Sequence, residues 1–166
     1  PMSRSNEYPN QNRGSAIVFG GAGFLGSHVA DELSRRGFKV TLFDQSESKW
    51  RLKSQTMVLG DIMDKKAVNK ACESHDYVYN FAGLADINAA FLNPDKTASL
   101  NIMGNLNILE GARNAGAKRF IFASSVYVFS ESGSFYRASK QASEKFVELY
   151  WEQYELPFTI LRYGSL

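Results

Sequence analysis

Short apolar runs alternate with longer amphipathic stretches along the chain. Short continuous apolar runs are typical of strands that are buried on both faces of a parallel sheet. Six runs of this kind are predicted to be strands, and they are residues 16–19, 40–43, 57–59, 77–81, 120–123 and 158–161.

Between these runs, apolar residues recur every three or four positions, as they do on one face of a helix. The clearest predicted helices are residues 24–36, 64–73, 96–114 and 136–154. Gly37 and Gly116 follow two of them, where a helix C-terminus favours a left-handed residue. The alternation predicts an α/β fold with a doubly wound parallel sheet that helices cover on both faces.

The length of the chain sets the number of domains. The sequence has 166 residues, 44% of them hydrophobic, which is enough for one core. Residues 1–14 are polar, so we expect a flexible leader, and residues 15–166 are expected to form a single domain. The apolar stretch 156–166 ends without a turn signal, so a following portion of the fold is expected to be absent.

Charge and composition exclude several classes of partner. The 19 basic and 17 acidic residues are scattered, with no basic block for a nucleic acid or a membrane surface. No apolar run is long enough to span a bilayer, and no signal peptide is evident, so we expect a soluble, cytoplasmic protein. The single Cys72 is interpreted as a small core residue, and neither it nor either histidine has neighbours at metal-ligand spacing.

A glycine-rich turn directly follows the first predicted strand and opens the first predicted helix. The spacing alone could reflect only a tight turn. Its position, together with an acidic residue at the end of the second strand, indicates a dinucleotide site in which backbone N–H groups approach the phosphates. The residues expected at the cofactor are Gly20, Gly23, Phe24, Leu25 and Gly26.

Two acidic residues follow the second and third predicted strands. A carboxylate at Asp44 can accept hydrogen bonds from the adenosine ribose of NAD and would repel the 2′-phosphate of NADP, so NAD is the expected cofactor. The alternative is that Asp44 only caps its turn. Asp61 and Ile62 are expected beside the adenine, although Asp61 could instead cap the next helix.

A tyrosine and a lysine four residues apart share one face of the last predicted helix. A phenol is a poor base at neutral pH, but a nearby ammonium and a positive nicotinamide would stabilise its phenolate. The spacing alone is usually an ordinary helix face. Downstream of a dinucleotide motif, however, it indicates that Tyr136 is a general base and that Lys140 assists it.

Taken together, these motifs resemble the extended short-chain dehydrogenase/reductase family, which contains the NAD-dependent nucleotide-sugar epimerases and dehydratases. The resemblance covers residue 15 to the end of the chain and implies a Rossmann fold. The matching motifs are the glycine turn, Asp44, Gly60-Asp61-Ile62, Asn80-Phe81-Ala82-Gly83, Asn101-Ile102-Met103-Gly104-Asn105, Phe122-Ala123-Ser124-Ser125, Tyr136-Arg137-Ala138-Ser139-Lys140 and Leu161-Arg162-Tyr163.

In such enzymes a tyrosine removes a hydroxyl proton while hydride leaves the same carbon for the nicotinamide. A lysine holds the nicotinamide ribose, and a serine or threonine orients the substrate hydroxyl. The resemblance implies these roles for Tyr136, Lys140 and Ser125, with Ser124 as the fallback because the following loop is shorter than in most relatives. It also implies that the dinucleotide groove is lined by Phe81, Ala82 and Gly83.

Dehydratases of this family carry an Asp and a Glu directly after the active-site serine or threonine. This chain has Val126 and Tyr127 there, and a valine cannot carry a proton. Dehydration is therefore not expected, unless the shortened loop brings in Glu131 as a substitute.

The leading hypothesis is an NAD-dependent nucleotide-sugar epimerase that acts through a transient 4-keto sugar. The alternatives are a net dehydrogenase or reductase on a nucleotide sugar, and a non-catalytic dinucleotide sensor, which would not need the Tyr136 and Lys140 pair. Since the family's substrate-binding portion is expected to be absent, the isolated fragment is expected to be inactive. The resemblance also implies a homodimer through helices 96–114 and 136–154, although their apolar residues could equally cover the sheet, and these are Leu106, Leu109, Phe146 and Tyr150.

Overall fold

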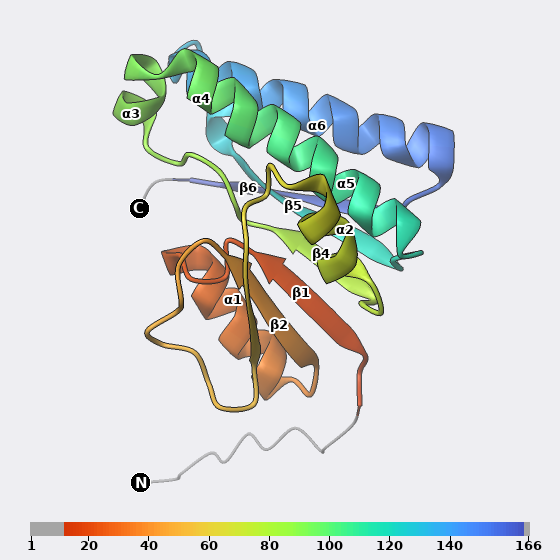
Figure 1. The fold of residues 1–166 in the computed structure, drawn as a ribbon. Coiled ribbons are helices and arrows are strands. Elements are labelled where there is room, and N and C mark those ends of the chain that lie inside the picture. The colour runs from red at the N-terminus through yellow and green to blue at the C-terminus, as the bar shows by residue number, and fades with distance from the viewer. Residues whose placement is uncertain (1–11, 165–166) are drawn as a thin grey trace, which may run out of the picture.

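Six strands form one parallel sheet within residues 12–164, the part of the chain that the computed structural model describes (Figure 1). Most of the expected flexible leader, residues 1–11, lies outside this part. The spatial order is β3-β2-β1-β4-β5-β6. The strands are β1 (Ser15–Phe19), β2 (Lys39–Asp44), β3 (Thr56–Leu59), β4 (Tyr77–Asn80), β5 (Arg119–Ser125) and β6 (Phe158–Tyr163).

Helices connect the strands as the alternating pattern predicts. Gly37 and Gly116 follow two of the helices with positive φ angles of 91° and 66°, as expected for helix C-termini. Within the described residues, no helix combines the length and the apolar character needed to cross a membrane. The helical segments are α1 (Phe24–Arg35), α2 (Lys65–Cys72), α3 (Ile87–Leu92), α4 (Pro94–Ala98), the π-helical η1 (Ser99–Met103), α5 (Gly104–Asn114), the 3₁₀ turn η2 (Val126–Phe129) and α6 (Ser134–Tyr154).

Helices cover both faces of the sheet, as predicted. On one face α1 packs Ala30 and Leu33 against apolar residues of β1 and β2. On the other face α2, α5 and α6 cover a larger core that contains Val68, Ile108 and Val147 (Figure 1). Burial of these apolar faces is the main favourable contribution to folding.

The side chains of Cys72 and His28 both make contacts within the fold. Cys72 is fully buried at the end of α2, and burial raises the pKa of its thiol to about 12, so it is a core residue. The ring Nδ1 of His28 lies 2.7 Å from the carbonyl oxygen of Phe24, one turn earlier in the same helix.

The strand order reverses between β1 and β4. The chain runs outward from β1 to β3, then crosses back to β4 and runs outward again to β6. In open sheets of this kind the connections leave in opposite directions at the switch point, and a crevice opens at the carboxyl ends of the two strands. The glycine-rich turn follows β1 at this point.

Candidate active site

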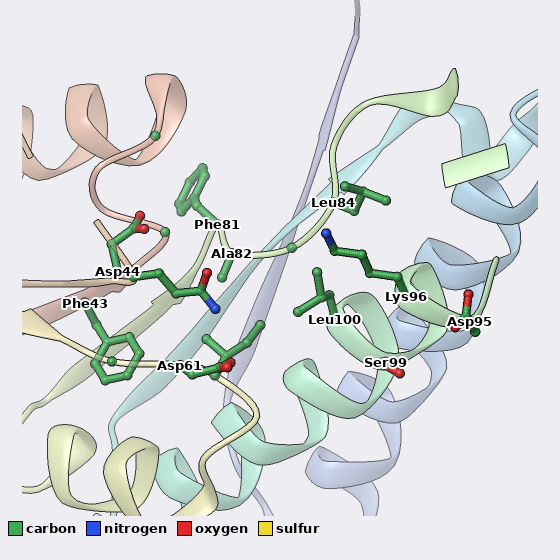
Figure 2. A pocket seen from close by; sticks show the side chains of 16 residues that line it. Phe43, Asp44, Asp61, Phe81, Ala82, Leu84, Asp95, Lys96, Ser99 and Leu100 are labelled. Atoms are coloured by element: carbon green, nitrogen blue, oxygen red, sulfur yellow. The ribbon is translucent and has the colours of Figure 1, made fainter. Parts of the chain in front are cut away.

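A cavity of about 620 Å³ lies at the carboxyl ends of the first four strands (Figure 2). This volume is within the range of about 300–1,000 Å³ that is usual for small-molecule sites. Eight of the expected cofactor residues line the cavity, and they are Gly20, Gly23, Asp44, Asp61, Ile62, Phe81, Ala82 and Gly83. The other residues expected at the site are not among those that line it: Phe24, Leu25, Gly26, Ser125, Tyr136 and Lys140.

The glycine-rich turn brings backbone close to the cavity because side chains do not fit there. Gly20 has a φ of 77°, and a Cβ at this position would lie 2.6 Å from the backbone of Phe81. A Cβ at Gly26 would clash with the carbonyl oxygen of Gly20, so Gly26 lets α1 pack against the turn. Gly26 thus shapes the site without lining it.

The N-terminus of α1 has the properties of an anion site. The N-cap residue of α1 is Gly23, which has no side chain to accept a hydrogen bond from the N–H groups of the first turn. This turn also contains no acidic residue. A helix N-terminus of this kind offers N–H groups and the positive end of the helix dipole. The uncapped turn and its glycines therefore fit a dinucleotide pyrophosphate.

Asp44 ends β2 and contacts the glycine-rich turn directly. One carboxylate oxygen accepts a hydrogen bond from the Ala22 N–H at 3.0 Å, and the other accepts one from the Ser46 N–H at 3.3 Å. The carboxylate thus stabilises the turn and also lines the cavity. The two interpretations of Asp44, cap and ribose ligand, are compatible because each carboxylate oxygen can accept a second bond.

Asp61 does not cap the helix that follows it. The Asp64 side chain caps α2 by accepting hydrogen bonds from the N–H groups of Lys66 and Ala67. Asp61 instead accepts a bond from the Met63 N–H at 2.9 Å and lines the cavity together with Ile62. Because Asp64 caps α2, the Asp61 carboxylate is available for a ligand.

The loop after β4 is held in place by a buried asparagine of η1. The Asn101 side chain accepts a hydrogen bond from the Leu84 N–H at 2.7 Å and donates to the Leu84 carbonyl and to the Ser139 hydroxyl. Gly83 must be a glycine because its φ is 124° and a Cβ would clash with the Asn101 side chain. Asn101 thus joins the cavity wall to α6.

Tyr136 and Ser125 lie together at the carboxyl end of β5. Tyr136 is on the first turn of α6 and is only 9% exposed. Burial raises the pKa of its hydroxyl, while a hydrogen bond with Ser125 lowers it. The neighbouring Ser124 is buried too, and its hydroxyl has no hydrogen-bond partner among the described residues. Ser125 thus influences the Tyr136 hydroxyl, and the assignment of the substrate hydroxyl to Ser125 with Ser124 as the fallback stays a prediction.

Lys140 lies one turn beyond Tyr136 on α6 and is buried. Its ammonium donates a hydrogen bond to the Ala123 carbonyl at 2.9 Å and lies 5.8 Å from the centre of the Tyr136 ring. Burial lowers the pKa of Lys140 to about 8, an effect that the negative charge of Glu144 opposes. The protein alone therefore raises the tyrosine pKa, and the expected activation of Tyr136 requires further positive charge.

An ion pair between the buried Glu144 and the exposed Arg162 supports this side of the site. Glu144 is 5% exposed, and its carboxylate accepts hydrogen bonds at 2.8 Å from the guanidinium of Arg162 on β6. The guanidinium also lies 4.7 Å from the centre of the Phe129 ring. Glu144 was not a predicted site residue, although its spacing of four residues from Lys140 places both on one helix face.

Sequence reasoning missed the far wall of the cavity. Apart from Gly60, which lies in the Gly60-Asp61-Ile62 motif, the unpredicted lining residues belong to no motif, and the fold brings those of α4 and η1 opposite the glycine-rich turn. The lining residues that were not predicted are Phe43, Gln45, Gly60, Leu84, Asp95, Lys96, Ser99 and Leu100.

The sequence matches known proteins of one family. Residues 16–166 match the NAD dependent epimerase/dehydratase family. The UDP-glucose 4-epimerase of Erwinia amylovora is 33% identical over 127 residues, which are 69% of this chain and 38% of that enzyme.

Two crystal structures show the same fold. The UDP-glucose 4-epimerase of Thermotoga maritima with UDP-glucose has a TM-score of 0.84 at 28% identity, over 90% of this chain and 55% of that one. The Thermus thermophilus enzyme in complex with NAD has a TM-score of 0.82 at 30% identity, over 90% and 54%. The chain thus spans about half the length of these structures.

Proposed function

Because the chain belongs to the NAD dependent epimerase/dehydratase family, we propose that it is the cofactor-binding part of an enzyme that inverts C4 of a nucleotide-linked sugar through a transient 4-keto sugar. The observation that carries this proposal is the placement of Tyr136, Ser125 and Lys140 together beside a dinucleotide cavity.

The cavity would hold NAD along the carboxyl edge of the sheet. Asp44 would accept hydrogen bonds from the hydroxyls of the adenosine ribose, and Asp61 and Ile62 would lie beside the adenine. The uncapped N-terminus of α1 would face the pyrophosphate. Lys140 would hold the nicotinamide ribose with the ammonium N–H groups that Ala123 does not use. When bound, NAD supplies a hydride acceptor that can return the hydride.

Tyr136 would take the proton of the sugar C4 hydroxyl, and Ser125 would orient that hydroxyl. Since burial raises the Tyr136 pKa, the phenol is protonated in the free protein at neutral pH. The Lys140 ammonium and a positive charge on the bound cofactor would lower that pKa, so the base forms only in the loaded site. Tyr136 would give the proton back to the C4 oxygen, and C4 would be inverted because the hydride returns to the opposite face of the 4-keto carbon.

The η2 turn favours an epimerase over a dehydratase. Residues Val126 and Tyr127 follow Ser125, and Tyr127 packs edge-on against the Tyr136 ring with 6.4 Å between ring centres. Dehydration needs an acid and a base in addition to the tyrosine. Glu131, the possible substitute, is exposed on the loop beyond η2.

The proposal is tested with the protein in its full encoded length. It is incubated with NAD and with UDP-glucose, UDP-galactose or their N-acetyl forms, and the anomeric signals are followed by ¹H NMR. We expect the C4 epimer to appear with no net NADH. Net NADH would favour the nucleotide-sugar dehydrogenase, and NAD binding without turnover of any sugar would favour the dinucleotide sensor.

A further inference from the structure

Lys96 lies on the wall of the cavity that faces the glycine-rich turn. It is on α4, and Figure 2 shows its side chain extending from that helix across the cavity towards Leu84 and Ala82. The first turn of α1 lies on the opposite side of the same space (Figure 2). A ligand that occupies the cavity would therefore pass between the α1 N-terminus and the Lys96 ammonium.

The charges around the cavity make this lysine unusual. Three carboxylates line the cavity, those of Asp44, Asp61 and Asp95. Among the described lining residues Lys96 is the single cation. A dinucleotide brings two negative phosphates into this space, so three acidic side chains disfavour the ligand unless a positive group faces its phosphates.

Lys96 has no structural task that would explain its position. Within residues 12–164 its ammonium makes no hydrogen bond or ion pair, and its side chain is exposed to the cavity and to solvent. The adjacent Asp95 does not pair with it. Some lysines of the described chain are engaged, as Lys118 is with Asp76, and others such as Lys70 are not, but Lys96 is the lysine that lines this cavity.

We propose that Lys96 binds the pyrophosphate of the dinucleotide from the side opposite the α1 N-terminus. The inference rests on the proposed NAD binding and adds to it a residue outside the family motifs. The lysine acts as a point charge, and its ammonium would donate a charge-assisted hydrogen bond to a phosphate oxygen. The carboxylates Asp44 and Asp61 then serve the adenosine half, where no phosphate competes.

The test measures the affinity of the 166-residue chain for NAD, ADP and adenosine by calorimetry or NMR titration. Lys96→Met should weaken NAD and ADP binding about tenfold, which corresponds to about 1.4 kcal/mol. Adenosine lacks the phosphates, so its affinity should not change in Lys96→Met. An unchanged affinity for adenosine would show that the variant keeps the cavity intact. Lys96→Arg should restore most of the affinity, because it keeps the charge.

The matched control is Lys70→Met, which removes an exposed lysine from α2, away from the cavity. It should leave all three affinities unchanged. The salt dependence of NAD binding should also decrease in Lys96→Met, since one ionic contact is lost.

Two results overturn the inference: wild-type affinity for NAD and ADP in Lys96→Met, or an equal loss for adenosine. If the wild-type chain bound none of the three ligands, the proposed function itself would fail, which is a distinguishable outcome.

Discussion

Asp44 stabilises the fold and, in the proposed function, also meets the ligand. Its bonds to the N–H groups of Ala22 and Ser46 hold the glycine-rich turn against the end of β2. The same bonds fix the negative charge at the cavity, so the charge cannot rotate away from a ligand. A 2′-phosphate placed there would meet a fixed negative charge.

We therefore expect the chain to bind NAD at least about tenfold more tightly than NADP, a difference of about 1.4 kcal/mol. Asp44→Asn keeps an acceptor for Ala22 but removes the charge, so the preference should largely disappear. Titration with both cofactors measures this. Asp61→Asn, which removes a charge from the neighbouring strand end in the same cavity, is the control and should alter the two affinities equally. Equal affinity of the wild-type chain for both cofactors would contradict the role given to Asp44.

Tyr136 is the residue on which the proposed chemistry depends. If the full-length protein has the proposed activity, Tyr136→Phe should lower kcat by about 100-fold or more, because general bases typically contribute factors of about 10²–10⁴. NAD affinity should change by less than about threefold, because the ring remains. Tyr127→Phe, which alters the tyrosine packed edge-on against Tyr136, is the control and should keep its turnover. Normal turnover in Tyr136→Phe would rule out the mechanism.

At the scale of elements, α6 carries the proposed general base and the lysine that assists it on successive turns. Tyr136, Lys140 and Glu144 are spaced by four residues, so they line one face of the helix next to β5 and β6. Arg162 of β6 neutralises the carboxylate end of this row. The helix therefore fixes both the distance and the charge balance between the tyrosine and the lysine.

This arrangement predicts the titration of Lys140. Burial lowers its pKa to about 8, so the ammonium loses its proton as the pH rises through about 8. Glu144→Gln removes the charge that raises this pKa, so the titration should move to still lower pH. NMR of ¹³C-labelled lysine side chains measures both values. Lys145, exposed in the same helix and with a pKa raised mainly by Glu148 and to a smaller extent by Glu144, should titrate at higher pH than Lys140. A Lys140 that titrates with the exposed lysines would contradict the burial described here.

The sequence predicted the strands and most helices because apolar periodicity reports burial, and these elements are buried on a sheet. It missed α3, which has six residues and leaves Phe91 and Leu92 mostly exposed. It predicted residues 96–114 as one helix, whereas the chain forms α4, the π segment η1 and then α5. The apolar periodicity of the sequence does not reveal a π segment, because one widened turn barely changes which residues face the sheet.

The site was predicted to a different extent on its two sides. Glycines and Asp44 are recognisable because backbone geometry and charge restrict those positions. The far wall, with Lys96 and Leu100, is brought to the cavity only by tertiary packing. No local pattern requires a lysine there, so no reading of spacing could have found it.

At the scale of the whole molecule, the two faces of the sheet differ. One face carries α1 and the other carries α2, α5 and α6 (Figure 1). Of the residues considered for a dimer contact, Leu109 is fully buried in the core, whereas Leu106, Phe146 and Tyr150 are only partly buried against it. The outer surfaces of α5 and α6 therefore still offer apolar area to a second copy.

We expect the protein to form a two-fold dimer through α5 and α6. Sedimentation velocity at micromolar concentration should show the dimer, and Leu106→Glu should shift it towards monomer by placing a charge in the contact. Leu52→Glu changes an exposed leucine in the loop whose Gln55 contacts α1, and it should leave the dimer intact. A monomeric wild-type protein would contradict the expectation.

The most direct test of the central claim follows the hydrogen at C4 of the sugar. UDP-galactose deuterated at C4 is incubated in ordinary water with the full-length protein and NAD, and the product is analysed by NMR and mass spectrometry. Transient oxidation with return of the same hydride predicts UDP-glucose that retains deuterium at C4. Loss of the label to solvent, or no C4 epimer at all, would contradict the account.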